Sequence, residues 1–339
     1  MIQAALQDLL DGRNLERARA REVMDEVMRG EATAAQIGGF LVALRLKGET
    51  AEEIAGFAEA MRAHVLAVRP ERTDLVDTAG TGGDGAQTLN ISTAAALVAA
   101  AAGAAVAKHG NRAVSSASGS ADVLEALGFS LEQPPARIER SIDELGFGFM
   151  FAPAHHPAMR HAAPVRRELA TRTVFNVLGP LTNPAGARAQ VIGVYAPTLV
   201  RTIAEVLASL GAHRAFVVHG AGGIDELSPA GPNLVCEVVE GSVREREIDP
   251  LELGIARCAP EELRGGTPAE NARAIREILA GADGGRRDAI LLNAAGAIAA
   301  AGHADDLHDG LEAAREAIDS GAAAERLELL AAFSRGEAA

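Results

Sequence analysis

Two polar loops, each followed by a helical pattern, carry the residues of this chain that are best suited to bind an anion. The first runs from Gly80 to Thr93 and the second from Lys108 to Ser120. Each loop can aim backbone N–H groups and the positive end of a helix dipole at a negative charge. Two such sites so close together in the chain predict one substrate with two anionic ends.

The first loop begins with GTGGDG at residues 80–85, which fits the glycine pattern of dinucleotide-binding proteins. A dinucleotide site also needs an acidic residue at the end of the next strand, and that strand ends in Lys108-His109. The loop is too long before its helix, and no Lys follows the glycines as a P-loop requires. We therefore interpret it as a nest for phosphate oxygens. Its polar side chains are Thr88, Asn90, Ser92 and Thr93.

The second loop is dense in polar groups, with two cations, one amide and four hydroxyls between Lys108 and Ser120. Lys108 and Arg112 can pair with phosphates, and Arg does so in a bidentate manner. Gly119 and Ser120 precede a helical pattern and can donate hydrogen bonds from its first turn. A solvated polar loop is the alternative, which the position beside the first loop disfavours.

An adjacent pair of acids, Asp225 and Glu226, follows the apolar run AFVVHG. On their own, such acids are equally typical of an ordinary helix start. Beside two phosphate loops they suit Mg²⁺, which takes one or two carboxylates and fills its other positions with water and substrate phosphates. The histidines at 155, 156 and 161 match no zinc spacing, so packing or capping is the favoured interpretation for them.

Helical patterns fill residues 1–69 and 129–188. Strands alternate with helices between these two segments and again from Gln190. Thr33 is the expected N-cap of an early helix and Thr267 that of a late one. Because helical segments interrupt an α/β pattern, we expect two domains, with the chain crossing between them more than once.

A βαβ unit carries the two loops. Residues 74–78 and 104–107 are its expected strands and 92–102 its helix, so the two strands should be parallel. Both loops then leave the carboxyl ends of neighbouring strands, where open α/β sheets bind ligands. A β-hairpin is expected further on, with its turn at Glu240-Gly241.

Composition limits the function classes. The chain is 48% hydrophobic with a formal charge of −14, so it can build a core but lacks the basic surface that nucleic acid requires. Cys236 and Cys258 have no CxxC spacing and are expected to be reduced thiols. The N-terminus has no secretory pattern, and the apolar runs near 94–107 and 288–301 are too short for a bilayer. We expect a soluble, cytoplasmic protein without nucleic-acid or membrane partners.

Five stretches follow one another between Asp77 and Gly302: DTAGTGGDGAQTLNIST, KHGNRAVSSASGSADVLEALG, FAPAHHPAMRHAAPVRRELATRTVFNVLGPLTNP, HGAGGIDELSP and RRDAILLNAAGAIAAAG. In these stretches the chain resembles the anthranilate phosphoribosyltransferase family. The resemblance implies an enzyme, a glycosyltransferase (pentosyltransferase) that joins the phosphoribosyl group of phosphoribosyl diphosphate to the amine of anthranilate. Diphosphate is released, and the reaction is the second step of tryptophan biosynthesis from chorismate. The family requires Mg²⁺ and usually forms homodimers.

The resemblance also implies the fold, which is a small all-helical domain plus a large α/β domain with a mainly parallel central sheet. This is the class of nucleoside phosphorylases and phosphoribosyltransferases with interrupted domains. Residues 1–72 with about 134–188 would form the helical domain, which dimerises and contributes to the acceptor site. Residues 73–133 with 189–339 would form the α/β domain, which holds phosphoribosyl diphosphate and Mg²⁺.

Roles for individual residues follow from the same resemblance. The phosphoribosyl donor would contact Gly80, Gly83, Asp84, Thr88, Asn90, Ile91, Ser92, Thr93, Lys108, His109, Gly110, Asn111, Arg112, Ala113, Val114, Ser115, Ser116 and Ser120. Anthranilate would contact Gly80, Asn111 and Arg166, and Mg²⁺ would contact Ser92, Asp225 and Glu226. Arg166 would bind the anthranilate carboxylate, a role that its spacing alone does not assign. No catalytic residue is firmly assigned, and His109 is a candidate proton acceptor.

Two other functions stay open at this point. A pyrimidine nucleoside phosphorylase shares the fold type, but its second loop would be of the kind KHSTGG, whereas this chain has KHGNR. A non-enzymatic, nucleic-acid-binding relative of the fold would need a basic surface, which the charge of −14 opposes. Departures from the family are small: Leu89 stands where Phe is common, and Thr267-Pro268 stands where Asp-Ala is usual.

Overall fold

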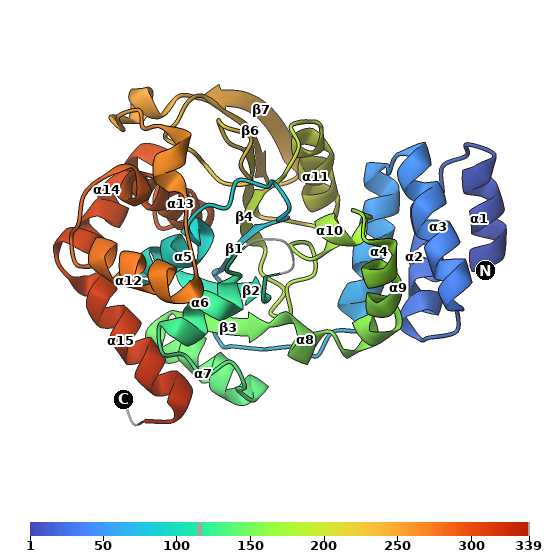
Figure 1. The fold of residues 1–339 in the computed structure, drawn as a ribbon, viewed down its shortest axis with the longest axis horizontal. Coiled ribbons are helices and arrows are strands. Elements are labelled where there is room, and N and C mark those ends of the chain that lie inside the picture. Colours follow the sequence, from blue (N-terminus) through green and yellow to red (C-terminus); the bar gives the residue numbers. More distant parts are fainter. Residues whose placement is uncertain (114–116, 338–339) are drawn as a thin grey trace.

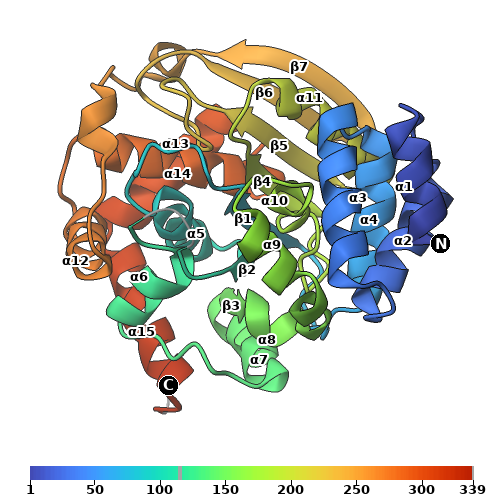
Figure 2. The same cartoon turned by 45° about the vertical axis from the view of Figure 1, so that its right-hand side comes forward.

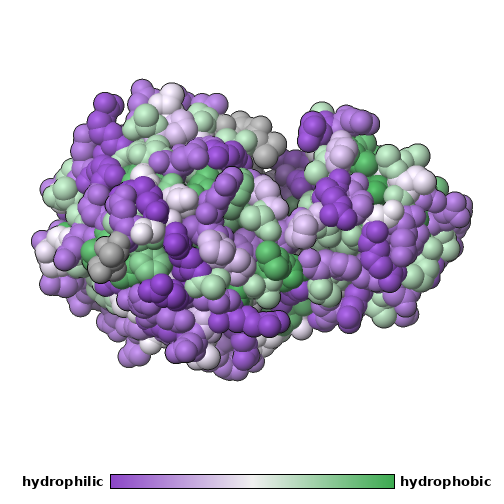
Figure 3. Space-filling view, turned by 90° about the horizontal axis from the view of Figure 1, so that it is seen from below, coloured by the Kyte–Doolittle hydropathy of each residue, from purple (hydrophilic) through white to green (hydrophobic). Residues whose placement is uncertain are grey.

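The computed structural model describes residues 1–113 and 117–337 and has two parts of unequal size (Figure 1). A bundle of helices at the N-terminus stands beside a larger α/β body, and the space-filling view shows the smaller lobe set off from the larger one (Figure 3). The outer surface in that view is mostly hydrophilic, with apolar residues scattered over it. None of the described helices is both long enough and apolar enough to cross a membrane.

Four helices build the N-terminal bundle: α1 (Ile2–Leu10), α2 (Arg17–Met28), α3 (Ala34–Lys47) and α4 (Ala51–Ala63). Thr33 caps α3, as the sequence predicts, and Thr50 caps α4 in the same way. In α4 the capping acid is Glu53, which is 0% exposed and also accepts bonds from Leu15 N (2.8 Å) and Lys47 Nζ (2.9 Å). One buried carboxylate therefore joins the start of α4 to the loop before α2 and to the end of α3.

A second helical segment packs on this bundle. It comprises α8 (Ala152–His155), the 3₁₀ helix η1 (Pro157–His161), α9 (Ala163–Leu169) and α10 (Phe175–Leu178). Val165 and Phe175 lie in the same apolar core as Phe40 of α3, so this late segment completes the early bundle. Figure 1 shows α9 and α10 between the bundle and the sheet.

The α/β body contains a seven-stranded sheet with the order β3-β2-β1-β4-β5-β6-β7. The first five strands in sequence are parallel, and β6 and β7 run antiparallel at one edge. Their bounds are Leu75–Gly80, Ala105–Gly110, Phe147–Phe151, Ala189–Gly193, Arg214–His219, Asn233–Val239 and Ser242–Ile248 for β1 to β7.

Apolar helices cover both faces of this sheet, as parallel strands require (Figure 2). In β5, Phe216 and Val218 face the core of α5 (Ile91–Ala101) and α13 (Gly285–Ala300), whereas Ala215 and Val217 face α11 (Thr198–Ser209) and the bundle. The other helices of this body are α6 (Ser120–Ala126), α7 (Pro135–Leu145), η2 (Pro250–Leu253), η3 (Pro260–Leu263), α12 (Pro268–Leu279), α14 (Leu307–Asp319) and α15 (Ala322–Arg335).

Most of the predicted local structure is confirmed. The βαβ unit is present, with Leu75 of β1 paired in parallel to Ala105 of β2. The hairpin turns at Glu240 (φ 46°) and Gly241 (φ 81°), the two positive φ angles of a type I′ turn. Thr267 caps α12 by accepting a bond from Glu270 N.

Strand β3 departs from the sequence prediction, which has only helices in residues 129–188. Phe147–Phe151 instead pairs in parallel with β2 and forms an edge of the sheet, and α7 packs against it. The prediction that this part is entirely helical is therefore wrong. We place α7 and β3 with the α/β domain and propose that the second helical segment begins at α8; the rest of the domain division stays a prediction.

The turn after β5 lies tightly against the carboxyl ends of β1 and β4, which are Gly80 and Gly193. A Cβ atom on Gly193 would lie 1.5 Å from the carbonyl oxygen of Asp225, and one on Gly80 would lie 2.3 Å from Asp225 Oδ2. Only glycine fits at these two positions, so the close approach of this turn to the sheet depends on them.

We expect Gly193→Ala to lower the free energy of unfolding by about 3 kcal/mol, because the added methyl overlaps backbone that cannot move aside. Gly296→Ala, inside α13, is the matched control, since the nearest atom to that Cβ would be Val191 Cγ2 at 3.4 Å, an ordinary van der Waals contact. The free energy of unfolding of this control variant should be unchanged or higher by up to about 1 kcal/mol. Urea unfolding of both variants checks this, and equal stability of the two would contradict the packing argument.

Candidate active site

The candidate site lies where the connections of the sheet change direction. From β1 the chain continues to β2 on one side, whereas β4 lies on the other side of β1 and leads on to β5. Open α/β sheets bind ligands at such a switch point, outside the carboxyl ends of the strands. Here those ends are Gly80 and Gly193, which lie side by side in the β1–β4 register.

Three carboxylates gather at this switch point. Asp225 N donates to Asp84 Oδ2 (3.3 Å), and Gly82 N donates to Asp225 Oδ2 (2.7 Å). Ser92 N donates to Glu226 Oε1 (3.1 Å), so the start of α5 faces the same acids. Burial raises the pKa of both Asp225 and Glu226, and the charge of Asp84 adds to the shift at Asp225 as that of Asp225 does at Glu226. The acids therefore repel one another in a site with little water.

Lys108 is the buried cation whose charge acts on these acids. It is 1% exposed, and its Nζ donates to Thr78 O (2.5 Å) and Thr78 Oγ1 (3.3 Å). Burial lowers the pKa of Lys108, while the charges of Asp77 and Glu226 act in the opposite direction. The ammonium group of Lys108 is thus bonded to Thr78 of β1, and its pairing with a phosphate stays a prediction.

The possible metal ligands at the switch point are oxygen atoms. Asp84, Asp225 and Glu226 are three acids, and Lys108 is a single cation. Hard divalent cations such as Mg²⁺ prefer such oxygen ligands. The hydroxyl of Ser92 lies within hydrogen-bonding reach of Glu226 and belongs to the same cluster. Asp225, Glu226 and Ser92, predicted from sequence as metal contacts, are thus brought together and fit a magnesium ion.

The first loop connects this cluster to the second loop. Asn90 Nδ2 donates to Ser118 O (3.0 Å), and Asn90 Oδ1 accepts from Asn271 Nδ2 (2.9 Å). The predicted proximity of the two loops is therefore confirmed. Ile91 and Thr93 have buried side chains, so they can face a ligand only through backbone. Gly80 ends β1, and Gly83, Asp84 and Thr88 lie between β1 and α5.

In the second loop, the groups expected to bind an anion bond to one another. Gly110 ends β2, and Asn111 N donates to Ser120 Oγ (3.2 Å). Gly119 N donates to Asp122 Oδ2 (2.9 Å) rather than pointing outward from the first turn of α6. Arg112 pairs with Asp122 and Glu125, so its guanidinium is not aimed at the switch point. Ala113 also bonds to Asp122. Val114, Ser115 and Ser116 lie outside the described residues.

His109 is buried at the end of β2, and its ring lies 4.9 Å from that of His156 between centroids. Burial lowers the pKa of His109 to about 3, with smaller contributions from His156 and His155. His109 is therefore neutral at pH 7 and a weak base. The expectation that His155 and His156 pack is confirmed, since both are buried and His155 Nδ1 bonds to Leu66 O (2.8 Å).

Arg166 comes from the helical part of the molecule, on α9. Its guanidinium stacks on the ring of Phe175 at 5.2 Å and forms no ion pair within the described part of the chain. A half-buried arginine without an acid partner is available for the carboxylate of a ligand. The geometry is compatible with the role that the family resemblance implies for it.

Sequence reasoning missed several residues that hold these loops. Asp77 accepts bonds from His109 N (3.1 Å) and from Asn183 Nδ2 (2.7 Å), inside the sheet. An acid within the apolar run of β1 was the available signal. Arg172 donates to Gly83 O and stacks on Tyr195 (4.3 Å), and no local pattern distinguished it.

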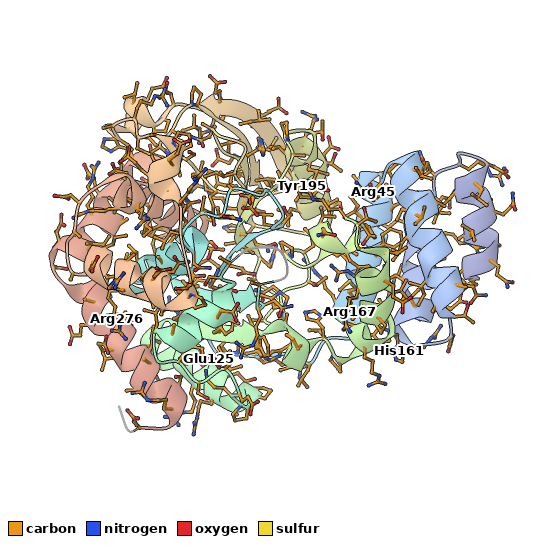
Figure 4. All side chains as sticks on the ribbon, in the orientation of Figure 1. Arg45, Glu125, His161, Arg167, Tyr195 and Arg276 are labelled. Atoms are coloured by element: carbon orange, nitrogen blue, oxygen red, sulfur yellow. The ribbon has the colours of Figure 1, made fainter. Side chains whose placement is uncertain are left out.

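Arg172 also connects the two parts of the molecule. Arg45 of α3 donates to Arg172 O (2.6 Å), while the Arg172 side chain contacts the first loop and Tyr195. Figure 4 shows Arg45 and Tyr195 on facing sides of the place where the bundle meets the α/β body. A chain of polar contacts therefore runs from the helical bundle to the glycine loop.

Comparison with known proteins identifies the family. Residues 3–65 match the helical bundle domain of a glycosyl transferase family, and residues 72–324 match its a/b domain. Anthranilate phosphoribosyltransferase of Anaeromyxobacter sp. (strain Fw109-5) is 55% identical over 338 residues, 100% of each chain. The chain belongs to the anthranilate phosphoribosyltransferase family. The enzyme of Desulforudis audaxviator (strain MP104C) is 57% identical, over 98% of this chain and 96% of its own.

Solved structures agree with this family. The anthranilate phosphoribosyltransferase of Thermus thermophilus has a TM-score of 0.93 and 51% identity, covering 98% of this chain and 99% of its own. That of Saccharomyces cerevisiae in complex with PRPP and Mg has a TM-score of 0.90 and 28% identity, covering 99% and 98%. The predicted fold class is confirmed, and these relatives favour the phosphoribosyltransferase interpretation over the phosphorylase and nucleic-acid-binding alternatives.

The crowded carboxylates predict a gain in stability when one is neutralised. In the presence of a chelator, we expect Glu226→Gln to raise Tm by about 2 °C or more. Burial and the charge of Asp225 raise the pKa of Glu226 to about 8, so folding must either protonate this carboxyl or bury its charge, and the amide avoids both costs. Adding donor and Mg²⁺ should then stabilise the wild type more than the variant. Glu277→Gln, at an exposed position of α12, is the control and should not change Tm. A lower Tm for Glu226→Gln in chelator would contradict this account.

Proposed function

We propose that this chain transfers the 5-phosphoribosyl group from phosphoribosyl diphosphate to the amine of anthranilate, giving N-(5-phosphoribosyl)anthranilate and diphosphate. The observation that carries the proposal is the cluster of Asp84, Asp225 and Glu226 at the switch point, between two loops that are bonded to each other. It occurs in a chain 55% identical to a named anthranilate phosphoribosyltransferase. The reaction is the second step of tryptophan biosynthesis from chorismate.

Mg²⁺ is the proposed cofactor, and Asp225, Glu226 and Ser92 are the residues that would hold it. When bound, the ion supplies positive charge that stabilises the departing diphosphate. Asp84 bonds to the backbone of Asp225 and so keeps the turn and the first loop together. Lys108, which is bonded to Thr78 of β1, offsets part of the negative charge of Glu226.

The donor would be held along the two loops. Its contacts on the first loop would be Gly80, Gly83, Asp84, Thr88 and the residues 90–93, and on the second loop Lys108 to Ser116 and Ser120. For Ile91 and Thr93 these contacts would be made by backbone, since their side chains are buried. The side chains of Lys108 and Arg112 bond to Thr78 and to Asp122 and Glu125, so these two residues would also contact the donor by backbone.

The acceptor would be held by Gly80, Asn111 and Arg166, with the guanidinium of Arg166 on its carboxylate. An aromatic amine is already neutral at pH 7, so its attack on the ribose needs no strong base. His109 is buried and its pKa is lowered to about 3, so it is a weak proton acceptor. Its proposed role is to line the site. Catalysis in this proposal rests on positioning and on charge stabilisation.

We also propose a homodimer formed through the helical domain, located in the cytoplasm. The bundle carries exposed apolar side chains, among them Leu10 on α1 and Val42 and Leu46 on α3. Leu46 is 82% exposed, and a second copy of the bundle would remove such side chains from water.

Loss of anthranilate fluorescence tests the proposed reaction. The purified protein should consume anthranilate only when phosphoribosyl diphosphate and Mg²⁺ are both present, because the buried acids need a cation before they can accommodate the diphosphate. A parallel assay of thymidine phosphorolysis should show no activity. Turnover of thymidine without turnover of anthranilate would overturn the proposal in favour of the phosphorylase.

Substitution of Arg166 separates the acceptor site from the donor site. Arg166→Ala should raise KM for anthranilate by about tenfold or more and leave KM for phosphoribosyl diphosphate within about twofold, since a charge-assisted bond to the carboxylate is lost. Arg167→Ala is the matched control on the same helix, with an exposed side chain, and should change neither constant. An equal rise of both KM values in Arg166→Ala would count against the assignment.

A further inference from the structure

The two ends of the second loop run directly against each other. A Cβ on Gly119 would lie 2.3 Å from Ala113 N and 2.6 Å from Asn111 O, and one on Gly110 would lie 2.1 Å from Ser120 Oγ. Ala121 N donates to Asn111 O (3.1 Å). The segment that leaves β2 therefore touches the segment that enters α6, with backbone against backbone.

One side chain, Asp122, bonds to both of these segments. Its Oδ2 accepts from Ala113 N (2.8 Å) on the outgoing segment and from Gly119 N (2.9 Å) on the incoming one. Its Oδ1 accepts from Arg112 Nη1 (3.0 Å). Such charge-assisted bonds are roughly twice as strong as neutral ones. Burial alone would raise the pKa of Asp122, but the two amides and Arg112 lower it, so the carboxylate is ionised at neutral pH.

Arg112, which bonds to Asp122, has two further partners. Its guanidinium also bonds to Glu125 (2.9 and 3.2 Å) and lies 5.8 Å from the ring centroid of Phe151, the last residue of β3. Glu125 is an exposed residue of α6 (Figure 4). The arginine is therefore engaged by α6 and β3, away from the acid cluster at the switch point.

We propose that Asp122 is a positioning residue for the transfer reaction: it clamps the two ends of the second loop and so places Asn111 and Ser120 together for the donor. Asn111 N donates to Ser120 Oγ, and Ser120 Oγ donates to Asn111 O (both 3.2 Å). These bonds join the same two chain segments that Asp122 joins. Arg112 serves as the charge partner of Asp122 in the clamp, not as a phosphate ligand. This proposal rests on the proposed function for its effect on turnover, but the clamp itself can be measured separately.

Hydrogen exchange at the amides of Ala113 and Gly119 tests the clamp without any assay of activity. Both amides should be protected in the wild type and in Glu125→Gln, which keeps every bond of Asp122. Protection should fall about tenfold or more in Asp122→Ala. If Asp122→Ala fails to fold, Asp122→Leu replaces it, because Leu is of similar shape but offers no oxygen to the two amides. Unchanged exchange in the variant that folds would overturn the clamp.

Steady-state kinetics test the positioning role. KM for phosphoribosyl diphosphate should rise about tenfold in Asp122→Ala and less in Asp122→Asn, while KM for anthranilate changes by less than about threefold because Arg166 is untouched. Glu125→Gln should stay within about twofold of the wild type. An equal rise of both KM values, or a rise in Glu125→Gln that matches Asp122→Ala, would overturn it. If the wild type does not turn over anthranilate, the proposed function fails, and the exchange result alone decides the clamp.

Discussion

The fold depends on how closely the turn after β5 approaches the ends of β1 and β4. Gly80 and Gly193 leave room for Asp225, whose backbone and carboxylate lie against both strands. This contact places Asp225 and Glu226 at the point where the strand connections reverse, with Asp84 beside them. Burying several carboxylates together is unfavourable unless a cation accompanies them. Protonation or a cation relieves this repulsion: burial raises the pKa of Asp225 to about 7 and of Glu226 to about 8, and the charge of Lys108 acts on Glu226 in the opposite direction.

The remaining structure brings two kinds of ligand contact to this point. Asn90 bonds the first loop to the second, and Asp122 closes the second loop on itself. The helical part contributes Arg166 on α9, and Arg172 contacts both the first loop and Arg45 of the bundle. A donor held by the α/β body and an acceptor held by the helical part would then meet between the two. The proposed reaction, which joins a sugar carbon to an amine, requires that meeting.

The parts of the site that depend on local pattern could be predicted from the sequence. The β1–α5–β2 unit, both loops and the Asp225-Glu226 pair could be found because turn residues, helix periodicity and buried strands leave local signatures. The family resemblance supplied the substrates, and the similarity of the chain to named relatives supports them.

What could not be predicted depends on contacts between distant segments. The sequence places Lys108 at the start of a loop, but β2 continues to Gly110, so its side chain is enclosed by the sheet. The loop pattern directs Arg112 toward phosphate, because nothing local shows that Asp122 and Glu125 lie within its reach. Phe147–Phe151 is too short to show a clear period, and only its pairing with β2 defines it as a strand.

The central claim is that the acids at the switch point hold the divalent cation that accompanies the donor. A crystal of the protein soaked with phosphoribosyl diphosphate and Mn²⁺, as an anomalous substitute for Mg²⁺, tests it most directly. The account predicts an anomalous peak within coordination distance of Asp225 or Glu226, with diphosphate beside the first loop. A bound donor without a peak there, or a peak only at the exposed cluster of His308, Asp309 and Glu312, would contradict it.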